Sequence, residues 1–159
     1  MKLHGKKLST LNNQIIIIPR EDGDIIFKAA AVLDMTDFDQ LCPEPKPPLI
    51  RKRGENVDTP DLNDKKYQEA VQKRNRQYTN YLILKSLQVT EGLEWETINL
   101  VDPSTWENLE KELQDTGFSS MERVQIIQGV MRANSLDMAY IEEARKRFFD
   151  LERQKASPQ

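Results

Sequence analysis

Four consecutive isoleucines occupy residues 15–18 and are followed at once by Pro19. Isoleucine is branched at its β-carbon and favours extended backbone, so this run predicts a β-strand with both faces covered. Proline has no N–H to donate to a sheet, and the strand is expected to end at Pro19. A charged turn with Gly23 follows, and residues 25–27 begin a second strand that can continue to residue 32. The pattern predicts a β-hairpin, which must pack on other elements or on another subunit because an isolated hairpin is marginal in water.

Side chains alternate along a strand, so Ile15 and Ile17 face one way while Ile16 and Ile18 face the other. Covering both faces would use most of the apolar surface of so small a protein. We therefore expect one pair to belong to the core and the other to be closed by a second copy or by a helical partner.

The composition is that of a polar but folded chain. Its 159 residues suit one domain, or one domain with a small appendage, and 38% of them are hydrophobic while 31% are charged. The net charge of −3 disfavours bulk electrostatic attraction to nucleic acid or to anionic lipid. The isoleucine run is too short for a signal peptide or a membrane crossing. The single cysteine, Cys42, cannot form an intrachain disulfide, and a cytoplasmic location is predicted.

Helix-capping residues, prolines and glycines along the chain predict an α+β, mainly helical fold. Residues 1–42 hold the hairpin and a short helix at 34–42, capped by Asp34 or Thr36. Residues 43–62 contain five of the eight prolines and dense charge, which predicts an extended linker arm. Residues 63–153 form a helical module, and residues 154–159 form a frayed tail.

The helical module is predicted to contain about four helices. The first spans about 64–89, because apolar residues recur there at a spacing of three and four. The second has a cap at Asp102, Pro103 in its first turn and a capping box at Ser104 and Glu107, and it ends at Gly117. Its apolar face is formed by Trp106, Leu109 and Leu113. The third opens with a capping box at Ser119 and Glu122, runs through Val124, Ile127, Val130 and Met131 to about Ala133, and ends with Asn134 in a left-handed conformation. The last is capped by Asp137 and runs to about residue 153.

The residue types that carry catalysis are scarce. His4 is the one histidine, which argues against a histidine base or a multi-histidine metal site. Cys42 lacks a plausible histidine partner and is expected to be a buried small hydrophobe. The six glycines are scattered and form no phosphate-binding loop. We expect a protein that is not an enzyme, with no catalytic, cofactor or metal site.

Candidate binding residues are apolar and aromatic. Residues 51–53 and 73–76 are basic, but their acidic flanks favour a solvated linker and helix face over nucleic-acid contact. An exposed apolar seam more often marks a partner surface. The expected partner-binding residues are Ile15, Ile16, Ile17, Ile18, Tyr67, Tyr78 and Tyr81.

Several longer strings resemble those of the small tail assembly chaperones of tailed bacteriophages. They are IIIIPREDGDIIFKAAAVLD, FDQLCPEPKPP, LKSLQVTEGLEWETINLVDPSTWENLEKELQDTGFS and VMRANSLDMAYIEEARKRF, and the resemblance runs from about residue 14 to 150. It implies a non-enzymatic factor without cofactors that binds the helical tape measure protein and helps to recruit tail tube subunits during tail morphogenesis. Such a factor acts in the host cell cytoplasm and is absent from the mature virion. Self-association is compatible with this function, whereas nucleic-acid and membrane partners are not expected.

Two alternatives stay open. A virion structural protein, such as a tail or head–tail connector subunit, would use the hairpin to extend a neighbour's sheet, and its presence in purified particles would identify it. A DNA-binding regulator is the weaker alternative, and salt-dependent binding to duplex DNA would reveal it.

Overall fold

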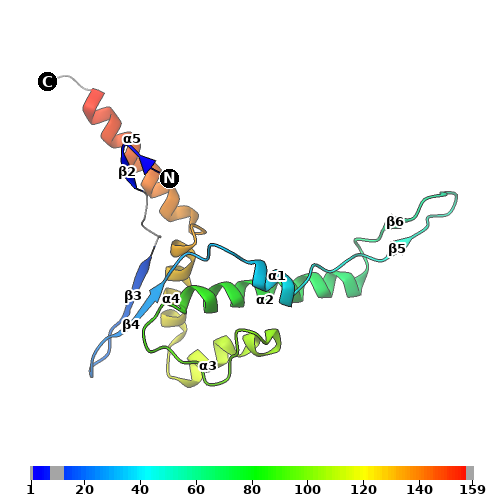
Figure 1. The fold of residues 1–159 in the computed structure, drawn as a ribbon, viewed down its shortest axis with the longest axis horizontal. Helices are drawn as coiled ribbons and strands as arrows, with labels where there is room; N and C mark the ends of the chain where they lie inside the picture. The colour runs from blue at the N-terminus through cyan, green and yellow to red at the C-terminus, as the bar shows by residue number, and fades with distance from the viewer. Residues whose placement is uncertain (1, 8–12, 157–159) are drawn as a thin grey trace. The chain divides into compact units, whose positions relative to one another are not determined.

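The computed structural model describes residues 2–7 and 13–156 and combines small antiparallel hairpins with helices (Figure 1). In chain order its elements are β1 Lys2–Leu3, β2 Lys6–Lys7, β3 Gln14–Ile18, β4 Ile25–Ala29, α1 Thr36–Leu41, β5 Leu49–Ile50, β6 Thr59–Pro60, α2 Lys65–Leu87, the 3₁₀ helix η1 Pro103–Asn108, α3 Leu109–Asp115, α4 Ser120–Ala133 and α5 Met138–Ala156. The predicted fold class, α+β and mainly helical with an N-terminal hairpin, is confirmed.

The chain divides into two compact units, each assembled from separate segments. Unit 1 comprises Met1–Val32, Ser86–Leu93 and Gly117–Gln159, and unit 2 comprises Leu33–Lys85 and Glu94–Thr116. Packing between segments that are distant in sequence defines these units. The linear division predicted from composition, at residues 43–62, stays a prediction.

The predicted hairpin of unit 1 consists of β3 and β4, which pair antiparallel with Ile16 opposite Phe27 and Ile18 opposite Ile25. Gly23 in the turn has φ 123°, the left-handed region that glycine enters without steric cost. Helix α4 packs on this hairpin, most closely on β3. The expectation that both faces would be covered holds for one face only among the described residues, because a single helix supports one side of the sheet.

Helix α4 begins as predicted. The hydroxyl of Ser119 accepts a hydrogen bond from the N–H of Glu122, and the Glu122 carboxylate accepts one from the N–H of Ser119 at 2.7 Å. The buried residues of α4 are Ile126, Gly129, Val130 and Ala133, whereas Val124 and Ile127 are exposed. The helix turns this face to the hairpin because Gly129, which has no side chain, lets Ile16 approach the helix backbone.

Asn134 follows α4 and binds three other groups. Its Oδ1 accepts the N–H of Val32 at 2.8 Å, while its Nδ2 donates to the Ser86 Oγ at 3.2 Å and to the Val130 carbonyl at 2.8 Å. The predicted left-handed conformation belongs to the next residue, Ser135, with φ 57°, whereas Asn134 has φ −95°. These side-chain bonds explain why asparagine lies one residue before the left-handed position.

Helix α5 is capped as predicted, since the Asp137 carboxylate accepts a hydrogen bond from the N–H of Tyr140 at 3.1 Å. The helix continues to Ala156, beyond the predicted end at residue 153. The rest of the predicted frayed tail, residues 157–159, lies outside the described residues.

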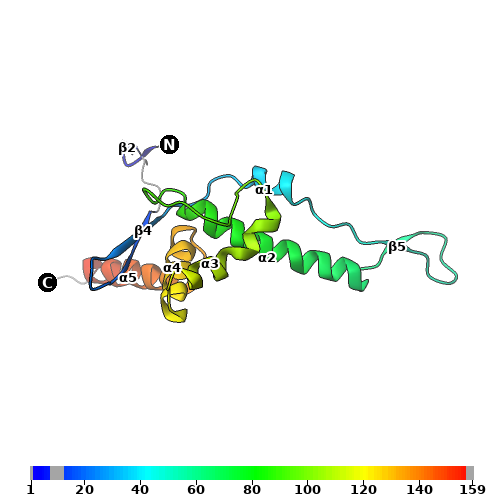
Figure 2. The ribbon, with the colours of Figure 1, turned by 90° about the horizontal axis from the view of Figure 1, so that it is seen from below.

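In unit 2, α2 confirms the long helix predicted over 64–89 (Figure 2). The Asp64 carboxylate accepts the N–H of Tyr67 at 2.8 Å and caps the helix start. At α1, the Asp34 carboxylate accepts the N–H of Thr36 at 2.9 Å. No helix among the described residues is both long and apolar enough to cross a membrane.

Aromatic side chains form the core of unit 2. Trp106 is fully buried, with its ring centroid 4.9 Å from that of Tyr81 and 6.1 Å from that of Phe38. The Trp106 indole N–H donates to the Asn99 carbonyl at 3.0 Å, so its polar atom is satisfied in the core. Leu109 and Leu113 are also buried, which confirms the predicted face of this segment.

The predicted cap at Asp102, with Pro103 in the first turn, is confirmed. The Asp102 carboxylate accepts the N–H of Ser104 at 3.0 Å. The first turns form η1, with Pro103 at their start, and α-helical bonding begins only at Leu109. Proline suits a first turn because its missing N–H would have no partner there.

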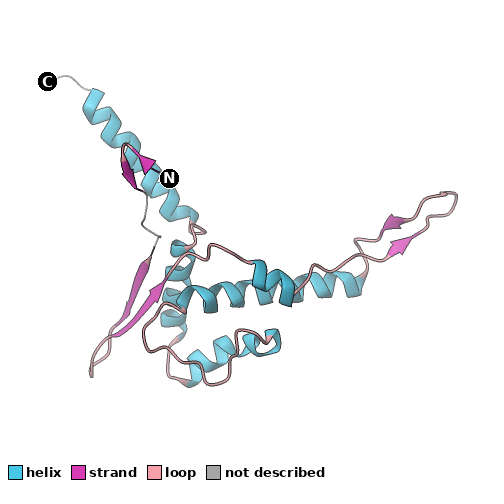
Figure 3. Ribbon diagram, in the orientation of Figure 1, coloured by secondary structure: helices cyan, strands magenta, loops and turns pink. Residues whose placement is uncertain are grey.

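The proline-rich arm contains a structure that the composition did not predict. Its strands β5 and β6 form a short antiparallel hairpin, with Leu49 opposite Pro60 (Figure 3). The Asp61 N–H donates to the Pro48 carbonyl at 2.8 Å, and Arg51 pairs with Asp58 at 2.9 Å. Its apolar side chains are largely exposed, which agrees with an arm that offers little surface to bury.

Candidate protein-binding site

The outer face of the β3–β4 hairpin carries three exposed isoleucines. Ile15, Ile17 and Ile26 have 67%, 54% and 51% of their surface exposed. Ile17 lies opposite Ile26, and Ile15 lies opposite Lys28. Neighbouring side chains on one face of a sheet lie side by side, so the three isoleucines form one apolar patch, bordered by Lys28, which we call the outer patch. This patch is the candidate binding site.

The opposite face fixes the orientation of the hairpin. Ile16, Ile18 and Phe27 are buried, and the Phe27 ring lies 5.7 Å from that of Phe118. A one-residue slip of β3 would expose its buried isoleucines and bury the outer ones. Of the four isoleucines predicted to bind a partner, Ile16 and Ile18 are therefore core residues, and Ile15 and Ile17 are available.

An ion pair holds the turn end of the hairpin against α4. The Arg20 guanidinium binds both oxygens of the Glu122 carboxylate, and it lies 5.5 Å from the centre of the Phe118 ring. The hydrogen bond from Arg20, together with that from the backbone of Ser119, lowers the pKa of Glu122 to about 2. The same carboxylate completes the capping box of α4, so the helix start and the hairpin share one anchor.

The outward edge of β4 is covered by the chain itself. The Lys28 N–H donates to the Thr90 hydroxyl, and that hydroxyl donates to the Lys28 carbonyl, both at 2.9 Å. The Ala30 N–H donates to the Ser86 carbonyl at 3.0 Å, and the Ser86 hydroxyl donates to the Ala30 carbonyl at 2.6 Å. Ser86 and Thr90 thus satisfy the outward-pointing backbone groups along this edge of β4.

The other edge of the sheet is open among the described residues, since β3 pairs with β4 alone. Backbone groups in an antiparallel pair point alternately toward the partner strand and away from it. The backbone N–H and C=O of Lys28 point toward Thr90 and away from β3. The backbone groups of Ile15, which lies opposite Lys28, therefore point away from β4. The same alternation directs the backbone groups of Ile17 away from β4. The residues of the outer patch on β3 therefore also present the open edge.

A polar recess of about 210 Å³ runs beside this edge. Strand β3 lines one side with residues 14–17, and α4 lines the other with Gln125, Gln128, Gly129 and Arg132. Glutamine side chains hydrogen-bond to exposed backbone groups as donors or as acceptors. The recess is suited to an extended backbone, whereas the outer patch is suited to apolar side chains.

The three tyrosines predicted to bind a partner lie on α2 in unit 2 and have different environments. Tyr81 is 2% exposed and belongs to the aromatic core, where burial raises the pKa of its hydroxyl. Tyr78 is 41% exposed, and its ring meets that of Phe38 edge-on at 5.3 Å. Tyr67 is half-buried. Tyr81 is therefore a core residue, and Tyr78 is the most accessible of the three.

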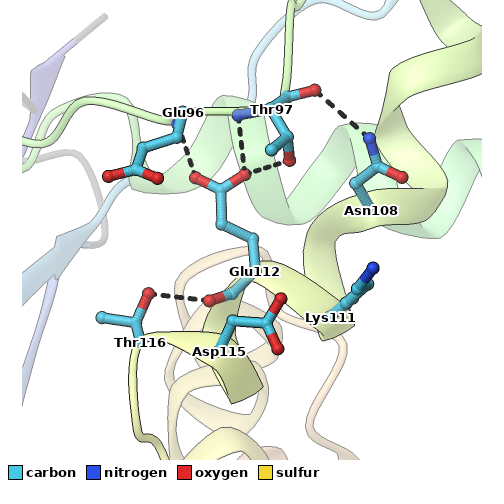
Figure 4. A pocket seen from close by; sticks show the side chains of 7 residues that line it. All are labelled: Glu96, Thr97, Asn108, Lys111, Glu112, Asp115 and Thr116. Carbon is cyan, nitrogen blue, oxygen red and sulfur yellow. Dashed lines mark hydrogen bonds between the residues drawn. The ribbon is translucent and has the colours of Figure 1, made fainter.

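A second polar recess, of about 390 Å³, lies over α3 in unit 2 (Figure 4). Glu112 points into it and accepts hydrogen bonds from the N–H groups of Glu96 and Thr97, at 2.6 and 3.0 Å, and from the Thr97 hydroxyl. Burial opposes the charge of Glu112, but the hydrogen bonds from Thr97 and Glu96 outweigh it and lower the pKa of the carboxyl group. Both carboxylate oxygens bind the loop, so Glu112 holds residues 96–97 in place. Its partners lie 15 and 16 positions away in the sequence, and no local pattern predicts the pairing.

The residues considered for catalysis are placed apart. His4 is exposed in the turn between β1 and β2, and Cys42 is buried at the end of α1. Burial raises the pKa of the Cys42 thiol, although Arg74 and Lys73 lower it in part. Among the described residues no group of three or more histidine, cysteine, aspartate or glutamate side chains is placed to hold a metal ion.

Two of the predicted basic residues engage acidic groups of their own unit. Arg74 pairs with Asp39 at 2.7 Å, donates to the Cys42 carbonyl at 2.8 Å and lies over the Phe38 ring. Arg51 pairs with Asp58. These contacts leave less basic charge for phosphate groups than a count of arginines and lysines implies.

Comparisons of this chain with protein-family models, with curated protein sequences and with solved structures find no match. The functional argument therefore depends on the surfaces described above and on the sequence strings that resemble tail assembly chaperones.

Proposed function

We propose that this protein is a non-enzymatic tail assembly chaperone, which binds the helical tape measure protein on the outer patch and helps to recruit tail tube subunits. The observation that carries the proposal is the exposure of Ile15, Ile17 and Ile26 on a hairpin whose other face and turn are fixed to α4. A preformed apolar patch binds a partner without first being ordered, which lowers the cost of association.

The chemistry of the patch favours a helical partner with an apolar stripe. Three isoleucines match the side chains that an amphipathic helix presents at a spacing of three and four residues. Full burial of an isoleucine stabilises by about 1.5–3 kcal/mol, and less where the side chain is already half covered. So small a patch gives a reversible contact. A reversible contact is what a chaperone needs if it is to leave its client before the particle is complete.

The resemblance of the sequence to tail assembly chaperones supports the choice of client. On this proposal the protein acts in the cytoplasm of the infected host and is absent from the mature virion. No step of this function needs a cofactor, a nucleic acid or a membrane.

The test is co-purification of this chain with the tape measure protein from the same phage. The double variant Ile15→Thr/Ile17→Thr keeps the β-branched shape but removes apolar surface. We expect it to retain less than about a tenth of the captured tape measure protein, corresponding to about 1.4 kcal/mol of binding free energy. The matched control is Val57→Thr/Leu62→Thr, which changes two exposed apolar residues of the arm and should bind normally. Equal capture by both variants and the unmodified chain would contradict the proposal.

A second candidate function is favoured by the open edge of β3. A virion structural protein would add a strand of a neighbouring subunit to this edge, beside Gln125 and Gln128. Mass spectrometry of purified particles separates the two functions, because a structural subunit is present in the virion and a chaperone is not.

A further inference from the structure

Helix α5 exposes large apolar side chains that the proposed function does not use. Phe148, Phe149 and Leu151 have 59%, 58% and 56% of their surface exposed, and Met138 is also exposed. Exposed aromatic and aliphatic side chains that gather on one helix face mark a contact surface in soluble proteins.

The intervals between four of the α5 residues show how this face is organised. Ile141, Ala144, Phe148 and Leu151 are separated by three, four and three positions. This is the order of alternating a and d positions in a coiled coil, in which each side chain enters a gap between four side chains of a facing helix. An open recess lies over the small Ala144, bordered by Ile141, Arg145, Phe148 and Phe149. A side chain of a second helix fits this recess as a knob fits a hole.

The charges beside this seam identify the second helix. With Ile141 and Phe148 at a positions, Arg147 occupies a g position and Glu152 the e position five residues later. In a parallel pair of identical helices, g of one helix faces this e position of the other, so each Arg147 meets the partner copy's Glu152. An antiparallel pair that buries the same four side chains would instead bring the two Arg147 guanidinium groups together. Opposite charges meet only in the parallel arrangement.

We propose that two copies of this chain associate through a parallel coiled coil of their α5 helices, with Ile141, Ala144, Phe148 and Leu151 in the interface and Arg147 paired with Glu152 across it. The interface covers two heptads and buries less than the roughly 800 Å² per partner of a standard protein complex. A dimer that dissociates in the micromolar range is expected.

The decisive comparison uses two apolar side chains of almost equal exposure, Phe148 inside the seam and Leu62 outside it. Sedimentation equilibrium of the full chain should show a dimer whose dissociation constant rises at least tenfold in Phe148→Ala, which empties an a position. Leu62→Ala removes an apolar side chain of similar exposure from the proline-rich arm and should leave the dissociation constant within twofold of that of the unmodified chain. Equal weakening by both changes, or a monomer at every concentration up to the millimolar range, would overturn the proposal.

Charge reversal and cross-linking test the direction of the helices. Arg147→Glu and Glu152→Arg should each weaken the dimer, and the double variant should restore it. In a Cys42→Ala background, Leu151→Cys should form an intermolecular disulfide under mild oxidation, because equivalent d positions lie together only in a parallel pair. Failure of the double variant to restore association, or absence of the disulfide, would exclude the parallel arrangement. If Ile15→Thr/Ile17→Thr abolishes dimerisation while Phe148→Ala does not, self-association belongs to the hairpin and the proposal is wrong.

Discussion

The side chain of Ile16 lies against the α-carbon of Gly129, so that a β-carbon added at Gly129 would overlap Cγ1 and Cδ1 of the isoleucine. Strand β3 therefore lies directly on the backbone of α4. Glycine within a helix costs about 0.5–1 kcal/mol relative to alanine. Close packing of Ile16 offsets that cost and determines which face of the hairpin turns outward.

Gly129→Ala should destabilise the protein although alanine is the better helix former. The added methyl group forces Ile16 to move, and overpacking of this kind costs about 1–3 kcal/mol. Urea unfolding followed by circular dichroism should show a lower free energy of unfolding. In an Ile16→Ala background the same change should be neutral or stabilising, because the overlapping atoms are gone. A Gly129→Ala variant that is more stable than the unmodified chain would show that β3 does not pack as described.

Trp106 is predicted to be a major stability determinant of unit 2. Trp106→Ala removes a fully buried ring from between Phe38 and Tyr81 and should lower the free energy of unfolding by about 3–5 kcal/mol. The half-buried Trp95 provides the control, and its replacement by alanine should cost clearly less. A loss below about 1 kcal/mol for Trp106→Ala would contradict the burial of the ring.

The sequence predicted the turns and helix caps that depend on interactions between neighbouring residues. The hairpin turn at Gly23, the capping box of Ser119 and Glu122 and the cap at Asp137 were all predicted, because each depends on a few neighbouring residues. The buried face of α4 was not predicted. Val124 and Ile127 are large apolar residues but are exposed, because the contact with Ile16 requires the smallest residue, Gly129, to face the strand.

In the candidate site, too, local features were predicted from the sequence and contacts between distant residues were not. The alternation of the isoleucine run is a local property, and it predicted that Ile15 and Ile17 share a face. The coverage of the β4 edge by Ser86 and Thr90 joins residues about 60 positions apart, and no spacing in the sequence predicts it. Tyr81 was included among the binding residues because a helical stripe alone does not show where along its length the core ends.

Stability should fall in acid through Glu122. Its pKa in the folded protein is about 2, against an ordinary value of 4.5, so the folded state binds this proton less readily than the unfolded chain does. The resulting stabilisation is complete above about pH 4.5 and is lost as the pH falls toward about 2. Between these limits Glu122→Gln should lose less stability than the unmodified chain, as measured by urea midpoints at a series of pH values. Arg20→Gln should also flatten the curve, and equal slopes for all three proteins would contradict the ion pair.

The two faces of the isoleucine run should respond oppositely to the same chemical change. Ile16→Thr/Ile18→Thr places two hydroxyl groups in the core and removes apolar atoms there, which should cost at least about 2 kcal/mol and can prevent folding altogether. Ile15→Thr/Ile17→Thr alters exposed side chains, and its free energy of unfolding should stay within about 0.5 kcal/mol per site of the original value. Thermal and urea unfolding of dilute protein, in which any dimer is dissociated, checks both. If the outer pair proves as costly as the inner pair, Ile15 and Ile17 are buried within a single chain, and the outer patch is not a binding surface.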